Sequence, residues 1–159
     1  MRASHWILTC LMLSACPAFV DDKPEAKLYD TEADGNRQIA AALKKAKAGK
    51  KRVLLQFGAN WCGWCHRLSN CFKENGEVAK ALREGYVVVL IDVDVVDDKQ
   101  HNADVVERYG NPTKHGLPVL VVLDAEGKLL TIQDTDELEE GDHHDPQKVL
   151  DFLNRWKPE

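Results

Sequence analysis

Two cysteines separated by two residues are the part of this sequence best suited to chemistry. Cys62 and Cys65 follow an apolar run, Val53 to Phe57, that predicts a buried strand, and they open a segment that predicts a helix. At this spacing the two sulfurs can close a small disulfide and open it again. A thiolate at a helix N-terminus is stabilised by unpaired backbone N–H groups and by the positive end of the helix dipole. We therefore expect Cys62 to be the nucleophile and Cys65, one turn further in, to resolve a mixed disulfide.

Two blocks of the sequence resemble the thioredoxin superfamily. The first, Val53 to Cys65, ends in a C-G-W-C motif like that of exported bacterial members, and the second, Gly116 to Asp124, resembles the family's proline-led strand. With the order of helices and strands, the resemblance covers about residues 36–156. It implies an α/β thioredoxin-like fold, with a central mixed β-sheet flanked by helices on both faces. It also implies an enzyme, a protein-disulfide oxidoreductase, and for exported substrate proteins we expect reduction or isomerisation rather than net oxidation.

The resemblance assigns roles to residues around the cysteine pair. It implies that Pro118 follows a cis peptide bond and faces the cysteines, and that the backbone of Leu117 pairs with a bound peptide. An ordinary trans proline that opens an edge strand is the alternative. Trp61 is expected to form an apolar rim beside the nucleophile, whereas Gly63 and Trp64 lie between the cysteines and should influence the redox potential.

Two further side chains are candidate modulators of the pair. Gln56 stands where many thioredoxins carry a buried aspartate, six positions before the nucleophile. Glutamine cannot relay a proton, so a carboxylate that helps Cys65 to ionise is absent or comes from elsewhere, although Gln56 could orient a water. His66 could stabilise the Cys62 thiolate when protonated, or it is only a solvent-facing helix residue.

The same cysteines also fit other kinds of site. Cys62 to His66 matches the C-x-x-C-H pattern of c-type haem attachment, but both methionines, Met1 and Met12, lie in the predicted leader, and the β-rich pattern does not suit a small cytochrome. A zinc site with Cys71 or a histidine lacks a second C-x-x-C pair. We expect no metal, and no cofactor besides the redox-active disulfide. A non-catalytic, redox-sensitive binding or assembly factor is the other alternative.

Apolar periodicity and capping residues predict the elements that position the cysteines. Helices are expected at residues 36–48, 62–75, 78–84, 103–109 and 146–156, the last capped by Asp145, and strands at 52–57, 86–93, 118–123 and 129–133. The β-branched run 86–93 is typical of a strand buried on both faces. Cys71 is expected to be a small apolar residue of the helix that begins at Cys62.

Two acidic segments are expected to be loops. The first follows residue 93 and contains three aspartates, which could bind calcium but lack the glycine and terminal glutamate of a calcium loop. The second covers residues 134–145 and contains His143 and His144, for which a polar loop is expected and weak metal binding is the alternative.

The pattern of residues 1–16 is typical of a signal for export. Arg2 provides a short positive region, and Trp6 to Leu13 is mostly apolar. Leu13 to Cys16 also resembles a bacterial lipobox, in which Cys16 is lipidated and becomes the mature N-terminus. Ordinary cleavage near Ala18, which leaves a secreted protein without an anchor, is the alternative. Either route leads to the periplasm or cell envelope, where disulfides persist.

A flexible tether is expected at residues 17–35 and a folded domain at residues 36–159. The tether is rich in charge, with only Leu28 and Tyr29 as sizeable apolar residues beyond residue 20. The net charge is −5, and the sequence has no concentrated stripe of basic residues. Nucleic acid is therefore not an expected partner. The expected partners are protein disulfides or dithiols and, from the resemblance, a membrane protein that donates electrons. Contact with the membrane is expected only through the lipid anchor.

Overall fold

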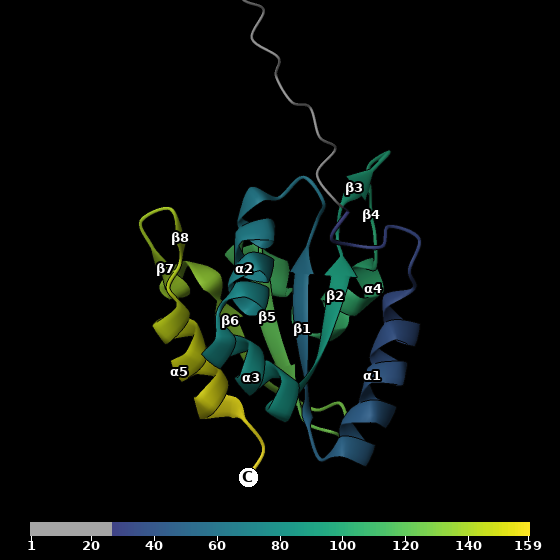
Figure 1. Ribbon diagram of the computed structural model, residues 1–159. Coiled ribbons are helices and arrows are strands. Elements are labelled where there is room, and N and C mark those ends of the chain that lie inside the picture. The colour runs from purple at the N-terminus through teal and green to yellow at the C-terminus, as the bar shows by residue number, and fades with distance from the viewer. Residues whose placement is uncertain (1–26) are drawn as a thin grey trace, which may run out of the picture.

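Strands β1 (Arg52–Gly58) and β5 (Val119–Leu123) are the inner strands of a four-stranded sheet, in a computed structural model that describes residues 27–159 (Figure 1). Strand β2 (Tyr86–Asp92) pairs with β1 in parallel, and β6 (Leu129–Asp134) pairs with β5 in the antiparallel direction. Because β1 and β5 are themselves antiparallel, the sheet is mixed, as predicted.

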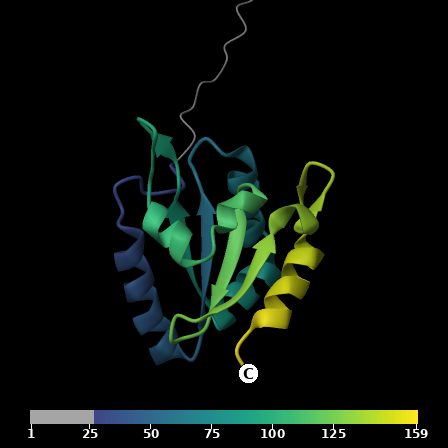
Figure 2. The same ribbon diagram turned by 180° about the vertical axis from the view of Figure 1, so that it is seen from behind.

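Helices cover both faces of this sheet, which confirms the predicted α/β class. Helices α1 (Gly35–Gly49) and α4 (Ala103–Arg108) lie on one face (Figure 2). Helices α2 (Gly63–Glu74), α3 (Gly76–Gly85) and α5 (Pro146–Trp156) lie on the other face (Figure 1). Asp145 caps α5 as predicted, since its side chain accepts hydrogen bonds from the amides of residues 147 and 148.

Side chains of β1 alternate between the two helical layers, because successive residues of a strand point to opposite faces. Val53, Leu55 and Phe57 belong to the buried cluster under α1 and α4. Leu54 belongs to the cluster under α2, α3 and α5. Gln56 has the same strand parity as Leu54 and is fully buried. This parity places Gln56 in the layer of α2, the helix that begins at the cysteines.

Strand β2 lies at an edge of the sheet. The prediction of a strand is confirmed, but the prediction that both of its faces are buried was wrong. Only β1 pairs with β2, and Val88 is 39% exposed whereas Val89 and Ile91 are buried. The apolar run serves the face that packs against α1 and α4. A run of β-branched residues therefore reports burial of one face here, not an inner position.

Both acidic segments predicted as loops contain short hairpins. The first holds β3 (Val95–Val96) and β4 (Lys99–Gln100), joined by two aspartates with φ angles of 51° and 59°. Positive φ at both central residues is the requirement of a type I′ turn, which tolerates Asp. The second holds the short helix η2 (Thr135–Leu138) and a hairpin of β7 (Glu139–Glu140) with β8 (His143–His144). Strands of two residues are too short to show a period in the sequence.

The remaining connection to the site also contains a short helix. Residues 110–116 include η1 (Pro112–His115), which leads toward β5. Gly116 and the cis Leu117–Pro118 bond lie between this helix and the first residue of β5.

The N-terminal strap, residues 27–34, packs onto the domain instead of forming a tether. Tyr29 is only 1% exposed, and the amides of Leu28 and Tyr29 both donate to the Asn60 side chain at 2.8 Å. The expected boundary at Asn36 is therefore too late, because Asn60 and the core beside it hold the strap. The export signal, Cys16 and residues 17–26 lie outside the described residues. Within residues 27–159, no helix is both long enough and apolar enough to cross a membrane.

Candidate active site

Cys62 and Cys65 form a disulfide at the N-terminus of α2. Their Cα atoms are 5.2 Å apart, and the Cys62 sulfur also caps the helix by accepting a hydrogen bond from the Cys65 amide at 3.1 Å. Cys62 keeps 5% of its surface exposed, whereas Cys65 is fully buried. Cys62 is therefore the more exposed of the two cysteines, which is the position that the expected nucleophile requires.

The peptide bond between Leu117 and Pro118 is cis, as the resemblance implied. The alternative, a trans proline at the start of an edge strand, is wrong on both counts, because β5 is an inner strand. The Leu117 side chain packs against the buried cluster of Tyr29, Cys62 and Cys65. The cis bond thus lies where the chain turns past the disulfide into β5.

Trp61 is the most exposed large apolar side chain near the disulfide, at 68% of its surface. Its ring nitrogen donates to Asp94 Oδ1 at 2.7 Å, which ties the indole to the base of the β3–β4 hairpin. Val95 and Val96 of that hairpin are 58% and 49% exposed. We refer to Trp61, Val95 and Val96 as the Trp61 patch. Trp61 directly precedes Cys62, the more exposed of the two disulfide cysteines.

Trp64 lies on the opposite side of the disulfide against a buried histidine. Its ring meets the His144 ring edge-on at 5.4 Å between centroids, and the Arg67 guanidinium lies 4.7 Å from the Trp64 ring. The position of Gly63, which lies between the cysteines, is open: a Cβ added there would meet nothing within 4 Å. Of the two residues between the cysteines, only Trp64 is held by neighbouring side chains.

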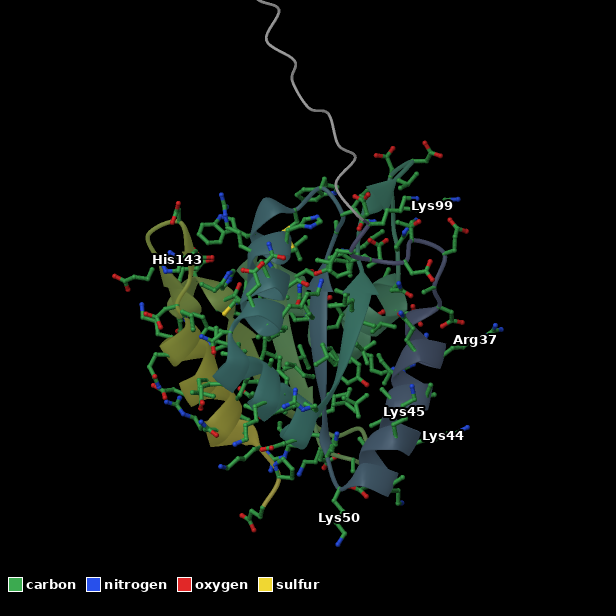
Figure 3. All side chains as sticks on the ribbon, viewed as in Figure 1. Arg37, Lys44, Lys45, Lys50, Lys99 and His143 are labelled. Atoms are coloured by element: carbon green, nitrogen blue, oxygen red, sulfur yellow. A yellow bond between two sulfur atoms is a disulfide. The ribbon has the colours of Figure 1, made fainter. Side chains whose placement is uncertain are left out.

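The polar loop expected for His143 and His144 is wrong for His144. His143 points outward from the hairpin (Figure 3), but the His144 side chain is completely buried, with Glu139 Oε1 at 3.9 Å and no hydrogen bond among the described residues. Burial, with smaller effects of Arg67 and His143, lowers the pKa of His144 to about 4. His144 is therefore neutral at neutral pH.

Gln56 lies directly beneath Cys65 and contacts a residue that sequence analysis placed in the tether. Its Nε2 donates to the Tyr29 hydroxyl at 2.7 Å and to the Cys65 carbonyl oxygen at 3.4 Å. Asn60 Nδ2 in turn donates to the Tyr29 carbonyl at 3.0 Å. The only sequence signal for these contacts is that Leu28 and Tyr29 are isolated apolar residues in an acidic segment.

His66 makes a specific contact with the loop before the helix. Its Nε2 lies 2.8 Å from the carbonyl oxygen of Asn60, so this nitrogen donates to a backbone acceptor. The histidine therefore helps to hold the loop that carries both Trp61 and the strap contacts of Asn60.

Cys71 is half-buried on α2 and is the one free cysteine among residues 27–159. It lines a groove of about 390 Å³ beside Arg67 and His144. Burial, together with Asp145 and Glu74, raises the pKa of the Cys71 thiol. Because the thiolate is the reactive form, Cys71 is a poor nucleophile.

The haem and metal alternatives would need the cysteines or neighbouring side chains to bind another group. Thioether bonds to haem would use both sulfurs, which are here bonded to each other. Within the described part of the chain, no group of three or more His, Cys, Asp or Glu side chains could hold a metal ion.

Comparisons with known proteins agree with this geometry. The sequence model of a family described as Thioredoxin-like matches residues 34–125. A solved structure of a disulphide isomerase from Xylella fastidiosa Temecula1 superposes with a TM-score of 0.70 and 32% identity, covering 81% of this chain and 95% of that one. The reduced C-terminal domain of Neisseria meningitidis DsbD has a TM-score of 0.55 at 21% identity, over 77% of this chain and 96% of that one.

One curated relative extends the comparison beyond solved structures. The thiol:disulfide interchange protein DsbD of Colwellia psychrerythraea (strain 34H) is 31% identical over 99 residues, which is 62% of this chain. This chain spans only 15% of the length of that relative.

Proposed function

This chain belongs to the thioredoxin-like family, and from this premise we propose that it reduces or isomerises disulfides of exported proteins through Cys62 and Cys65. It is a disulfide oxidoreductase with a C-x-x-C active site and the α/β fold of its family. The observation that carries the proposal is the disulfide at the start of α2, in which Cys62 is the more exposed cysteine, with Leu117 of the cis Leu117–Pro118 bond packed against the pair. The similarity to a disulphide isomerase supports the choice of reduction or isomerisation over net oxidation.

Reduction of a substrate disulfide takes two exchanges. The Cys62 thiolate attacks one substrate sulfur, so that a mixed disulfide forms while the other substrate sulfur leaves as a thiolate and takes a proton from solvent. Cys65 then loses its proton to solvent and attacks the Cys62 sulfur. The bond between Cys62 and the substrate breaks, and the second substrate sulfur leaves with the electron pair. Two electrons have passed to the substrate, and Cys62 and Cys65 end as a disulfide.

A substrate peptide is proposed to lie across the disulfide between the two tryptophans. The Leu117 backbone would pair with it, with Pro118 behind, and the Trp61 patch would contact apolar side chains next to the substrate cysteine. Gly63 leaves open space above the helix start, while Trp64 is held by His144 and Arg67. Gln56 and His66 act from below and beside the pair, through the hydrogen bonds described above.

Net reduction requires a partner that returns two electrons after each turnover. We propose that a membrane protein with a dithiol supplies them, and that the protein works in the periplasm or cell envelope. The predicted leader at residues 1–16 supports export, and lipidation at Cys16 would hold the domain at a membrane surface. Labelling of cells with a fatty-acid analogue tests the lipidation: the wild-type protein should incorporate the label and Cys16→Ala should not.

Replacement of each cysteine by serine tests the exchange function. With insulin as the disulfide substrate, Cys62→Ser should abolish reduction, and Cys65→Ser should accumulate a mixed disulfide that a non-reducing gel detects. Cys71→Ser is the matched control and should reduce insulin at the wild-type rate. A Cys62→Ser protein that still reduces insulin would refute the mechanism. The binding or assembly role would be the correct one under two conditions. The wild-type protein shows no turnover of insulin, and Cys62→Ser still binds an unfolded exported protein.

The equilibrium potential of the Cys62–Cys65 couple against glutathione decides the direction. A reductant should have a potential near that of thioredoxin, about −270 mV, whereas a value near about −120 mV is typical of an oxidant.

A further inference from the structure

Tyr29 reaches from the N-terminal strap to the back of the active-site disulfide. Its side chain is fully buried, and Asn60 holds its backbone at both the amide, at 2.8 Å, and the carbonyl, at 3.0 Å. A Cβ placed on Gly58 would collide both with the Tyr29 hydroxyl and with the Cys65 sulfur, the latter at 2.6 Å. The hydroxyl and the sulfur therefore face the same small space above Gly58.

The hydrogen bonds of Gln56 determine which way the Tyr29 hydroxyl can act. Gln56 Nε2 donates to the hydroxyl oxygen at 2.7 Å and lies 3.4 Å from the Cys65 carbonyl oxygen. Because a carbonyl oxygen can only accept, the amide nitrogen must point toward it, and the hydroxyl oxygen is an acceptor from Gln56. The hydrogen of the hydroxyl is left to donate to another atom.

The other charged or titratable groups around this space are already partly engaged. Asp92 of β2 accepts from His101 at 2.6 Å, and its second oxygen has no hydrogen-bond partner among the described residues, so the hydroxyl does not donate to it here. His66 of α2 donates to the Asn60 carbonyl. Burial raises the pKa of Tyr29, against the effect of Gln56 and with a smaller contribution from Asp92. The hydroxyl therefore keeps its proton at neutral pH.

We propose that the Tyr29 hydroxyl donates a hydrogen bond to the Cys65 thiolate in the reduced protein, at the position where the chain lacks a carboxylate. The role rests on the proposed exchange function. In the second exchange, Cys65 loses its proton to solvent, and its sulfur attacks Cys62 while the substrate sulfur leaves with the electron pair. Tyr29 keeps its own proton throughout. A hydrogen bond to the charged form favours that form, so Tyr29 promotes ionisation of Cys65.

The titration of Cys65 in the reduced, full-length protein tests this role. Cysteine labelled with ¹³C at Cβ reports each thiol separately, and Cys62→Ser assigns the two active-site signals. Tyr29→Phe should move the Cys65 midpoint to higher pH, so that its thiolate fraction at a fixed pH below the midpoint falls about tenfold. Tyr86→Phe is the matched control. Tyr86 is also a buried tyrosine, but its hydroxyl donates to the Leu153 carbonyl at 2.7 Å, in the cluster under α2, α3 and α5.

The outcomes separate the hydroxyl from general effects. If Tyr29→Phe leaves the Cys65 midpoint unchanged, or if Tyr86→Phe moves it equally, the role of Tyr29 is refuted. If Asp92→Asn moves the midpoint and Tyr29→Phe does not, the carboxylate is the group that acts and the proposal also fails. If Tyr29→Phe does not fold, uniform 3-fluorotyrosine strengthens the donor instead and should move the midpoint to lower pH; no movement would refute the role.

The titration needs no substrate. A protein that fails to reduce insulin would therefore leave the Tyr29 result intact, and a negative titration would leave the exchange function intact.

Discussion

At the level of single residues, the active site depends on the space that Gly58 leaves open. Gly58 is the last residue of β1, and both the Tyr29 hydroxyl and the Cys65 sulfur occupy the position that a larger side chain would need. Glycine is required here because of close approach by neighbouring side chains, not because of an unusual φ angle. Because it has no side chain, Gly58 lets Tyr29 of the strap and the Cys65 sulfur pack against the end of β1.

Gly58→Ala should therefore destabilise the protein and disturb the cysteine pair. Overpacking of a well-filled core costs about 1–3 kcal/mol, and here the added methyl group must displace either Tyr29 or Cys65. Urea unfolding should show the loss, and the redox potential of the pair should change with it. Gly76→Ala is the control, because a Cβ at the start of α3 meets nothing within 4 Å. Equal stability of both variants would contradict the crowding around Gly58.

At the level of elements, two segments that sequence patterns do not reveal support the active-site helix. The N-terminal strap lies behind the disulfide, held by Asn60. The β7–β8 hairpin lies beside α2 and brings His144 against Trp64 (Figure 1). Both depend on side-chain contacts with the region around the cysteines, so changes in either should be measurable at the site.

Asn60→Ala should release the strap from the domain. Three hydrogen bonds to residues 28 and 29 are lost, and the cost should be about 1–3 kcal/mol because the buried amide of Tyr29 is left without its partner. Hydrogen exchange read by mass spectrometry should show faster exchange at residues 27–34 and little change in α5. Asn70→Ala, at an exposed position of α2, is the control. Unchanged protection of the strap would show that Tyr29 is held by packing alone.

The β7–β8 hairpin should make stability depend on pH through His144. Its pKa is about 4 in the folded protein and near 6.5 when unfolded, so the unfolded chain binds more protons between these values. The stabilising effect of neutral His144 is complete above about pH 6.5 and is lost as the pH falls toward 4, by on the order of 3 kcal/mol. Arg67 and His143 add to the cost of a charged His144 ring. Glu139 is the acidic group beside the ring, with its Oε1 at 3.9 Å from His144 Nε2.

Urea unfolding at pH 7, 5 and 4 measures this effect. His144→Phe keeps an aromatic ring against Trp64 and should lose less stability than wild type over this range. His143→Gln, at an exposed position of the same strand, removes only a smaller contribution to the lowered His144 pKa and should keep most of the wild-type pH dependence. A His144→Phe protein with the full wild-type pH dependence would show that other groups cause it.

At the level of the whole molecule, the surface around the disulfide is asymmetric. The Trp61 patch accounts for most of the exposed large apolar side chains of the described residues, whereas Leu129 is 38% exposed at the opposite end of the sheet, where β6 begins beside the end of β5. An exposed apolar patch at a redox site is suited to binding an unfolded or extended protein chain. The patch should therefore matter for protein substrates and not for small disulfides.

Replacement of Val95 and Val96 by serine tests this division. The loss of two partly exposed apolar contacts should lower kcat/KM for insulin about threefold to tenfold. The rate with glutathione disulfide should stay the same, because that substrate has no large apolar side chain for the two valines to contact. Leu129→Ser removes a similar exposed side chain far from the cysteines and should affect neither rate. Equal losses for insulin and glutathione disulfide would mean that the hairpin supports the disulfide itself, not the substrate.

The sequence by itself determined the main helices and strands of the domain and the place of the cysteine pair between a strand and a helix. A C-x-x-C motif between a buried strand and a helix, a capped C-terminal helix and a proline-led strand are local patterns, since each is encoded by neighbouring residues. Only the tertiary structure decided that β2 lies at an edge, that His144 is buried against Trp64, and that Tyr29 reaches Gln56 from 27 positions away. Periodicity reports which face of an element is apolar but not which distant segment covers it. A charged segment with two apolar residues is therefore indistinguishable from a tether until a core provides a place for them.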